Sequence, residues 1–265
     1  DILNNTFEDQ YYRGIHCDNL PYVQVNRNTV SSTTSYSSYT GIYLEYCDNG
    51  IEVLYNRINL TTGYYGLYLN YCDGSSSNRG LIGNNFISIT GGSGTCKGIY
   101  TYRTNYQNFY YNSVNITRSG TSNICFHQYY SSYTDNYQLQ NNSFTNYGGG
   151  YCIRIEDISC LNISDYHNFY TTGSYIGNWN GSNTSALTNW QSSSLKDPNS
   201  VSVDPIYMSS TNLHTCSAGL NGAGYPVTQL TDDIDGQTRD IFTPDIGADE
   251  FSGTISLNFP TDTTI

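Results

Sequence analysis

Two short segments decide the fold, GIYLEYC at residues 41–47 and GLYLNYC at residues 66–72, because they are near copies of one another. In each of them apolar and polar side chains alternate, which is typical of a half-buried β-strand. Looser copies of the same segment begin at Gly14, Gly98, Asn123 and Cys152. One strand pattern therefore recurs about six times along the chain.

A second landmark, an asparagine two positions before an apolar residue, advances together with the first. Its copies are 23, 28, 28, 28 and 30 residues apart, and they are Asn5, Asn28, Asn56, Asn84, Asn112 and Asn142. A third landmark is an apolar residue three positions before an asparagine, and its copies are Val25, Val53, Leu81, Phe109 and Leu139. Three landmarks that repeat in register predict the coils of a parallel β-helix, which stack at a spacing of about 4.8 Å.

Stacking of equivalent positions predicts two columns of inward side chains. The first column contains Ile15, Ile42, Leu67, Ile99, Ile124 and Ile153. The second contains Val30, Ile58, Phe86, Val114 and Phe144. We expect the repeated asparagines to be structural, because their side chains bond backbone groups at turns and can bond to each other along the stack.

The repeat fades after Ile163, which predicts three regions. Residues 1–164 would form about six coils of 23–30 residues, residues 165–252 an irregular C-terminal cap of the same solenoid, and residues 253–265 the start of a linker or of a further module. The only two tryptophans, Trp179 and Trp190, are the expected plugs of the open hydrophobic end.

The C-terminal segment carries two motifs, DIDGQTR at residues 233–239 and PDIGADEF at residues 244–251. Together with DPIY at residues 204–207 and the following Leu213, they resemble the closing segment of secreted bacterial right-handed parallel β-helix proteins, especially those of the Bacteroidetes. The resemblance implies a right-handed helix, export and surface display, often by type IX secretion, and no single activity. The usual SPAIDxG segment of that family is altered to SAGLNGAG here.

Arg239 and the neighbouring acids of this tail allow two interpretations. Arg239 can pair with Asp245 or Asp249 and fix the last segment, because a guanidinium matches a carboxylate. Asp232, Asp233 and Asp235 are candidates for binding Ca²⁺, which prefers clustered oxygen ligands, although they lack a complete EF-hand loop. No other cofactor is expected.

The composition excludes several classes of partner. The 265 residues have a net charge of −12, and charged residues make up 12%, about half the usual share. Nucleic-acid binders and proteins of anionic membranes need a basic face, so neither partner is expected. The apolar runs are too short for this segment to insert into a membrane. Because the chain begins at Asp1 without a methionine or a signal peptide, we expect a processed protein or a piece of a longer one.

Eight cysteines without metal-binding spacing favour disulfides and an oxidising, extracellular location, with buried thiols as the alternative. Cys47 and Cys72 occupy equivalent positions in successive coils, within the distance that a disulfide allows. They are the first candidate bridge. Cys152–Cys160 and Cys160–Cys216 are further candidates.

Tyrosines dominate the outward positions of the repeated strand. One outward column reads His16, Tyr43, Tyr68, Tyr100, Cys125 and Arg154, and its neighbour reads Asp18, Glu45, Asn70, Tyr102, His127 and Glu156. Stacked aromatic rings beside acids and amides suit sugar rings and their hydroxyl groups. The predicted ligand- or partner-binding face is Tyr43, Tyr68, Tyr100, Tyr102, Glu45, Asn70, His127 and Arg154. A solvated strand face and lateral packing against a sister chain are the alternatives.

No catalytic residue can be assigned from the sequence. The motifs of polygalacturonases and the clustered aspartates of pectate lyases are missing from the coils, and the four histidines form no recognisable triad. The first hypothesis is therefore a non-enzymatic structural or adhesive module of an extracellular bacterial surface protein or fibre, attaching to cells, glycans or sister chains. The alternative is a polysaccharide-binding or polysaccharide-degrading lyase or hydrolase. A viral tailspike is a weaker third hypothesis.

Overall fold

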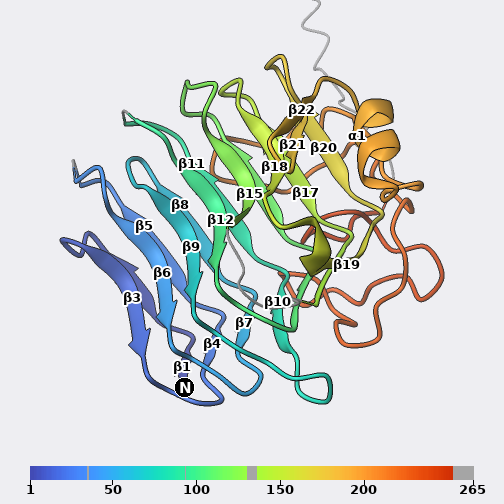
Figure 1. Ribbon diagram of the computed structural model, residues 1–265. Coiled ribbons are helices and arrows are strands. Elements are labelled where there is room, and N and C mark those ends of the chain that lie inside the picture. Colours follow the sequence, from blue (N-terminus) through green and yellow to red (C-terminus); the bar gives the residue numbers. More distant parts are fainter. Residues whose placement is uncertain (35, 93, 130–135, 253–265) are drawn as a thin grey trace, which may run out of the picture.

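The computed structural model describes residues 1–34, 36–92, 94–129 and 136–252, and these residues form a parallel β-solenoid of about six turns (Figure 1). Each full turn contributes one short strand to each of three sheets, which we call sheets A, B and C. Every strand pairs in parallel with its equivalent in the next turn, except for the last pair of sheet C. The predicted all-β parallel solenoid is confirmed.

The three sheets run along the whole solenoid. Sheet A contains β1 (Ile2–Leu3), β4 (Gln24–Asn26), β7 (Glu52–Leu54), β10 (Gly80–Gly83), β13 (Gln107–Tyr110), β16 (Tyr137–Gln140) and β19 (Leu161–Asp165). Sheet B contains β2 (Thr6–Glu8), β5 (Thr29–Ser32), β8 (Arg57–Leu60), β11 (Phe86–Ile89), β14 (Ser113–Ile116), β17 (Ser143–Asn146) and β20 (Asn168–Thr171). Sheet C contains β3 (Arg13–Asp18), β6 (Thr40–Glu45), β9 (Tyr65–Asn70), β12 (Lys97–Tyr102), β15 (Ile124–Tyr129), β18 (Tyr151–Ile155), β21 (Gly177–Trp179) and β22 (Ser182–Thr184). A 3₁₀ turn, η1 (Ile158–Cys160), and one helix, α1 (Leu187–Ser194), complete the regular structure of the described residues.

A ladder of asparagines, buried in every coil after the first, forms the corner between sheets A and B. Each ladder asparagine follows a residue with a positive φ, such as Tyr111 at 54°, which turns the chain sharply. Asn112 shows the bonding: its Oδ1 accepts from the side-chain amide of Asn85 at 2.9 Å, and its Nδ2 donates to Asn142 Oδ1 at 2.9 Å and to the Ile82 carbonyl at 3.0 Å. The ladder consists of Asn5, Asn28, Asn56, Asn85, Asn112 and Asn142. The prediction that these side chains are structural fits this bonding.

The prediction for the fourth coil was wrong by one residue. Asn85, not Asn84, belongs to the ladder, and Ile87 rather than Phe86 pairs with Ile58 and Val114. Ile82 likewise replaces Leu81 in the inward column of sheet A. The ladder spacing accounts for the shift. Asn56 and Asn85 are 29 residues apart, one residue more than the 28 that separate Asn28 from Asn56. Because Asn84 and Asn85 are adjacent, the sequence pattern alone could not show which of them belongs to the ladder.

The predicted inward column of sheet C also needs one correction. The structure aligns Ile99 with Phe126 and then with Ile153, so Phe126 takes the place assigned to Ile124. Cys125 consequently follows Gly98 in the column of Gly14, Gly41, Gly66 and Gly98, and it is fully buried. A cysteine at a position held by glycine in earlier coils displaced the sequence alignment by two residues.

The sheets continue beyond residue 164, where an irregular cap was expected. Residues 168–171 and 177–179 still join sheets B and C. The ladder also continues, because the Asn142 backbone N–H donates to His167 Nδ1 and the His167 N–H donates to Ser200 Oγ. Trp190 closes this end as predicted. It is fully buried, and its ring centroid lies 5.3 Å from that of Trp179.

The tail after residue 200 packs along the side of the solenoid rather than over its end (Figure 1, orange to red). Leu213, Ile234 and Ala248 pack on Phe86 of sheet B, and the Ala248 N–H donates to Ser113 Oγ at 2.9 Å. A second apolar cluster joins Val227 and Leu230 to sheet A. The predicted linker at residues 253–265 lies outside the described residues.

The predicted disulfides are not formed in the structure. All eight cysteines are thiols, and seven of them are buried. Cys47 and Cys72 lie at equivalent corners, but their thiols donate to backbone carbonyls, that of Cys72 to Leu44 at 3.4 Å. Cys152 and Cys160 are likewise buried.

Within the described part of the chain, no helix is long and apolar enough to cross a membrane. The one α-helix among the described residues, α1, has eight residues.

Asn112→Ala should reduce the free energy of unfolding by about 3 kcal/mol or more, because each buried group that loses its partner costs about 1–3 kcal/mol. Urea denaturation measures this loss. Asn162→Ala, at an exposed position, is the matched control and should change stability by less than about 0.5 kcal/mol. An equal effect of the two substitutions would contradict the structural role of the ladder.

His167→Asn should become relatively more stable than the parent chain as the pH falls from 7 to 5. Burial lowers the pKa of His167 to about 3, and its Nδ1 can accept from Asn142 only while the ring is neutral. The unfolded chain binds a proton below about pH 6.5, so the contribution of His167 to stability is complete above that pH and is lost below it.

The expected change in the difference between the two proteins is about 2 kcal/mol over this range. The difference is the quantity to measure by urea denaturation, because burial also raises the pKa of the adjacent Asp197 to about 6, which acts in the opposite direction. Parallel pH profiles would show that His167 titrates normally in the folded chain.

Candidate functional site

The outer face of sheet C carries a continuous ladder of aromatic rings. The ring centroids of His16, Tyr43, Tyr68, Tyr100 and His127 follow one another at 5.1, 4.8, 4.9 and 5.2 Å. Strand register produces the ladder, because it aligns one outward position in five successive strands. Arg154 continues the column, as expected.

Two residues of the predicted outward columns are placed differently. Cys125 points into the core, and His127 takes its position in the first column beside Tyr100. Tyr129 then pairs with Tyr102 in the second column, where His127 was expected. Both changes follow from the two-residue shift of β15.

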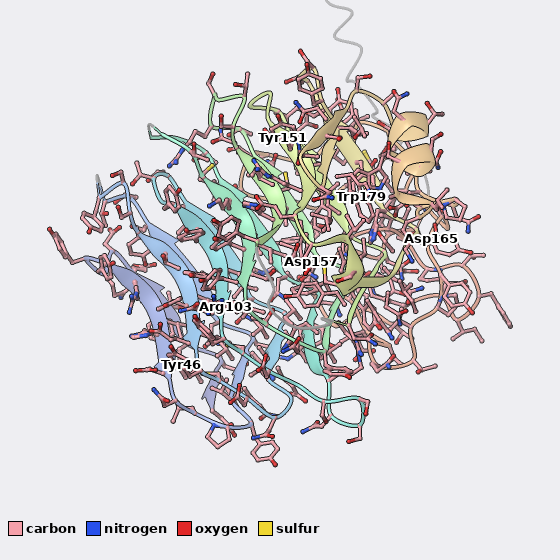
Figure 2. The ribbon with its side chains drawn as sticks, viewed as in Figure 1. Tyr46, Arg103, Tyr151, Asp157, Asp165 and Trp179 are labelled. Carbon is pink, nitrogen blue, oxygen red and sulfur yellow. The ribbon has the colours of Figure 1, made fainter. Side chains whose placement is uncertain are left out.

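The second column supports the first through hydrogen bonds. Asn70 Nδ2 donates to the Tyr43 hydroxyl at 2.8 Å and to Glu45 Oε1 at 2.7 Å. Further along, Tyr102 stacks on Tyr129 at 5.9 Å. Figure 2 shows the side chains of this face, with Tyr46 and Arg103 nearer the N-terminal coils and Tyr151 nearer the other end.

Stacking buries most of the ladder, contrary to the alternative of a solvated strand face. Tyr43 is only 6% exposed and Tyr100 only 7%. Each ring covers its neighbours above and below, so the middle of the ladder stabilises the sheet and offers little free aromatic surface. A ligand could reach these rings only where the ladder is open.

The ladder is open beside the first three strands of sheet C, where a pocket of about 370 Å³ lies. Its lining residues are Tyr12, Arg13, Ser38, Thr40, Tyr43, Tyr64, Tyr65 and Tyr68. Five tyrosines supply the aromatic walls, and Ser38 and Thr40 supply hydroxyl groups. We call this the tyrosine pocket.

Only Tyr43 and Tyr68 of these residues were predicted from the sequence, because the alternation of inward and outward side chains breaks at the glycines. A Cβ atom on Gly66 would lie 2.4 Å from Ile87 Cγ2 in the core, so Gly66 and Leu67 both face inward. Tyr65 therefore lies on the same outer face as Tyr68, and their rings are 4.7 Å apart. The pair Tyr64-Tyr65 directly before Gly66 was the available clue.

Two cations lie against the aromatic walls. The Arg13 guanidinium lies 4.2 Å from the ring centre of Tyr43 and 4.8 Å from that of Tyr12. Lys97 Nζ lies 4.1 Å from the Tyr100 ring and 5.1 Å from the Tyr65 ring. Burial lowers the pKa of Lys97 to about 8, so the amine is still mostly charged at neutral pH.

The buried tyrosines keep their hydroxyl protons at physiological pH. Burial raises the pKa of Tyr43, Tyr65 and Tyr68 well above its usual value. Each hydroxyl can therefore both donate and accept a hydrogen bond. Aromatic faces beside neutral hydroxyls can accommodate a ring that is apolar on its faces and polar at its edge.

The predicted residues at the other end of the ladder form a closed network instead. His127 Nε2 and Arg154 both lie 3.0 Å from Glu156 Oε1. Burial, aided by Lys97 and Arg154, lowers the pKa of His127 to about 2, so its ring is neutral and donates to Glu156. His127 and Arg154 therefore lie at the far end of the column and do not line the tyrosine pocket.

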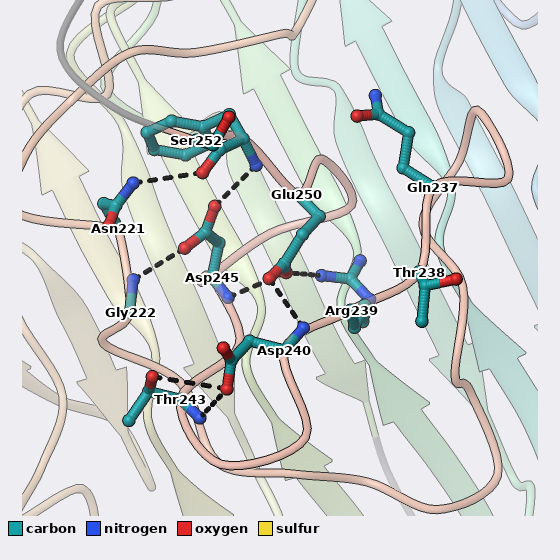
Figure 3. Close-up of a pocket in the computed structure, with 11 residues that line it drawn as sticks. Asn221, Gly222, Gln237, Thr238, Arg239, Asp240, Thr243, Asp245, Glu250 and Ser252 are labelled. Atoms are coloured by element: carbon teal, nitrogen blue, oxygen red, sulfur yellow. Dashed lines mark hydrogen bonds and ion pairs between the residues drawn. The ribbon is translucent and has the colours of Figure 1, made fainter.

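A polar pocket of about 460 Å³ in the tail has its charged groups already paired (Figure 3). Asp245 accepts from the backbone N–H groups of Gly222 and Phe251. Arg239 pairs with Glu250 at 3.1 Å and donates to Asn84 at 2.7 Å, so the predicted pairing of Arg239 with Asp245 or Asp249 was wrong. These contacts give the tail motifs a structural role.

The three aspartates proposed for Ca²⁺ do not converge. Asp233 is fully buried, and its carboxylate accepts from the backbone of Asp235, Gln237 and Glu250. Asp235 faces Arg57 and His214 instead, at 2.5 Å from each. Among the described residues, Asp232 belongs to no cluster of potential metal ligands.

Comparison with protein-family models, curated proteins and solved structures gives no match for this chain. The fold and the side-chain geometry therefore provide the basis for assigning a function.

Proposed function

We propose that this chain is a structural and adhesive module of an extracellular bacterial surface protein, and that it attaches through the tyrosine pocket to neutral glycans. The observation that carries the proposal is the pocket itself, where five tyrosines and two small hydroxyl side chains meet beside a rigid sheet. Sugar rings stack on aromatic faces and bond hydroxyl groups at their edges. Sister chains are the second class of partner for the same face, since tyrosine is enriched in protein interfaces.

The rigidity of the site favours recognition without large movement. Tyr43, Tyr65 and Tyr68 are held by stacking on one another, so ordering them on binding costs little conformational entropy. The net charge of −12 disfavours acidic polysaccharides, because the long-range field repels them. Neutral glycans therefore suit the pocket better than acidic ones.

An extracellular, bacterial setting is supported by the tail motifs and by the architecture. The DIDGQTR and PDIGADEF segments resemble those of exported β-helix proteins of the Bacteroidetes, for which type IX secretion is the expected route. A stacked solenoid with an aromatic outer ladder suits a rod-shaped module of a filament or an adhesin. A polysaccharide lyase or hydrolase on the same scaffold is the competing proposal.

Tyr12→Ala should weaken binding of a neutral oligosaccharide about tenfold, since loss of one aromatic contact costs roughly 0.5–1.5 kcal/mol in addition to the lost buried area. Tyr12 lines the pocket and is 46% exposed, so its removal should leave the fold intact. A glycan array selects the oligosaccharide, and calorimetry measures the dissociation constants.

Tyr175→Ala is the matched control, because Tyr175 is 43% exposed at the other end of sheet C and should not affect binding. An array without neutral ligands, or equal losses in both variants, would refute glycan attachment at this pocket. Sedimentation velocity then tests for association of sister chains. Release of reducing ends or of unsaturated products from a polysaccharide would favour the enzyme.

A further inference from the structure

Three potential metal-ligating side chains from separate tail segments converge outside sheet B. His214 Nε2 lies 2.5 Å from Asp235 Oδ2 and 4.0 Å from Asp249 Oδ1, and all three atoms lie within 4.8 Å of one another. His214 follows Leu213 of the apolar cluster, while Asp235 and Asp249 come from the two tail motifs. Their convergence is a tertiary feature that none of these segments could produce alone.

Each of the three side chains is held by a different partner through the atom that points away from the cluster. Asn212 Oδ1 accepts from His214 Nδ1. Arg57 donates to Asp235 Oδ1 at 2.5 Å, and the Thr215 N–H donates to Asp249 Oδ2 at 3.0 Å. Outer partners of this kind fix the orientation of ligands in metal sites. This pattern distinguishes the cluster from a chance group of surface acids.

The three side chains of the cluster differ in burial, and the difference suits the binding of an ion. Asp249 is only 4% exposed, and no hydrogen bond of the described residues uses its Oδ1, which faces His214. His214 and Asp235 remain partly open to solvent, with side-chain exposures of 25% and 34%. An ion therefore has a buried anionic ligand on one side and an access route on the other.

We propose that His214, Asp235 and Asp249 bind a divalent transition-metal ion, with Zn²⁺ as the best fit. Tetrahedral Zn²⁺ with bonds of about 2.0–2.2 Å separates its ligand atoms by about 3.3–3.6 Å. The observed separations of 2.5 and 4.0 Å from His214 Nε2 lie on either side of this value, so small side-chain rotations complete the geometry. A fourth position remains for water.

The chemistry of the three ligands selects the ion. One imidazole nitrogen and two carboxylates suit Zn²⁺, whereas Ca²⁺ requires six to eight oxygen ligands. Since Nδ1 donates to Asn212, Nε2 is the ring nitrogen that faces Asp235 and that can ligate the ion. Arg57 pairs with Asp235 and offsets part of the negative charge of the two carboxylates.

Metal binding would fasten the tail to the solenoid. Arg57 and Phe86 belong to β8 and β11 of sheet B, and the His214 ring packs edge-on against Phe86 at 5.1 Å. The site therefore joins three tail segments to the side of two coils. This role does not depend on glycan binding at the tyrosine pocket, which lies on sheet C.

The test is equilibrium dialysis of the full chain, first freed of metal by a chelator, against Zn²⁺ alone. We expect one ion per chain in the parent protein and loss of binding in His214→Gln and in Asp235→Asn. Asn212→Ala keeps all three ligands and should weaken binding about 10–100-fold. Asp232→Asn is the matched control, since this neighbouring acid lies outside the cluster and should not alter affinity.

Co²⁺ as a substitute ion reports the ligands directly. Visible absorption typical of tetrahedral nitrogen and oxygen ligation is expected, and circular dichroism checks that every variant is folded. The proposal is overturned if the parent chain binds no Zn²⁺, or if His214→Gln binds as tightly as the parent. A sulfur-to-cobalt charge-transfer band that persists in both ligand variants would assign the ion to cysteines and would equally overturn it.

Discussion

The asparagine ladder between sheets A and B holds successive coils in register. At every turn the corner between sheets A and B would leave backbone groups without partners, and an unpaired buried group costs more than any single contact there returns. Asparagine supplies an acceptor and two donors in one short side chain, so each copy satisfies its own coil and bonds to the next, as Asn112 does. Where the ladder ends, His167 and Ser200 take over its bonds.

A parallel stack fixed in this way imposes its register on every face. The ladder and the sheets keep equivalent positions one strand apart, so identical outward residues must contact one another. On sheet C this places Tyr43, Tyr68 and Tyr100 in one continuous stack. Rings that cover each other are shielded from solvent. The aromatic surface that a partner can reach is therefore in the tyrosine pocket, which Tyr12 and Tyr65 also line.

The tail packs against equivalent positions of successive coils on the outer face of sheet B. Small polar side chains on the outer face of sheet B, such as Ser113 and Ser143, leave room for the tail and bond to it. The shifted fourth coil contributes as well, because Phe86 points outward and packs against Leu213 and His214. A local irregularity of the repeat thus creates the place where the tail, and the proposed metal site, are attached.

The parallel solenoid, the structural asparagines and the closing tryptophans could be predicted from the amino-acid sequence, because residue spacing and polar–apolar alternation are local properties of the chain. The tertiary structure was needed to show that Asn85 rather than Asn84 joins the ladder and that Phe126 rather than Ile124 takes the inward position, since one extra residue in a coil or a cysteine in place of a glycine shifts the register. It also decided that Tyr65 shares a face with Tyr68, and that His214 meets Asp235 and Asp249. Those contacts depend on how distant segments pack, and packing is settled by burial and hydrogen bonding across the whole fold.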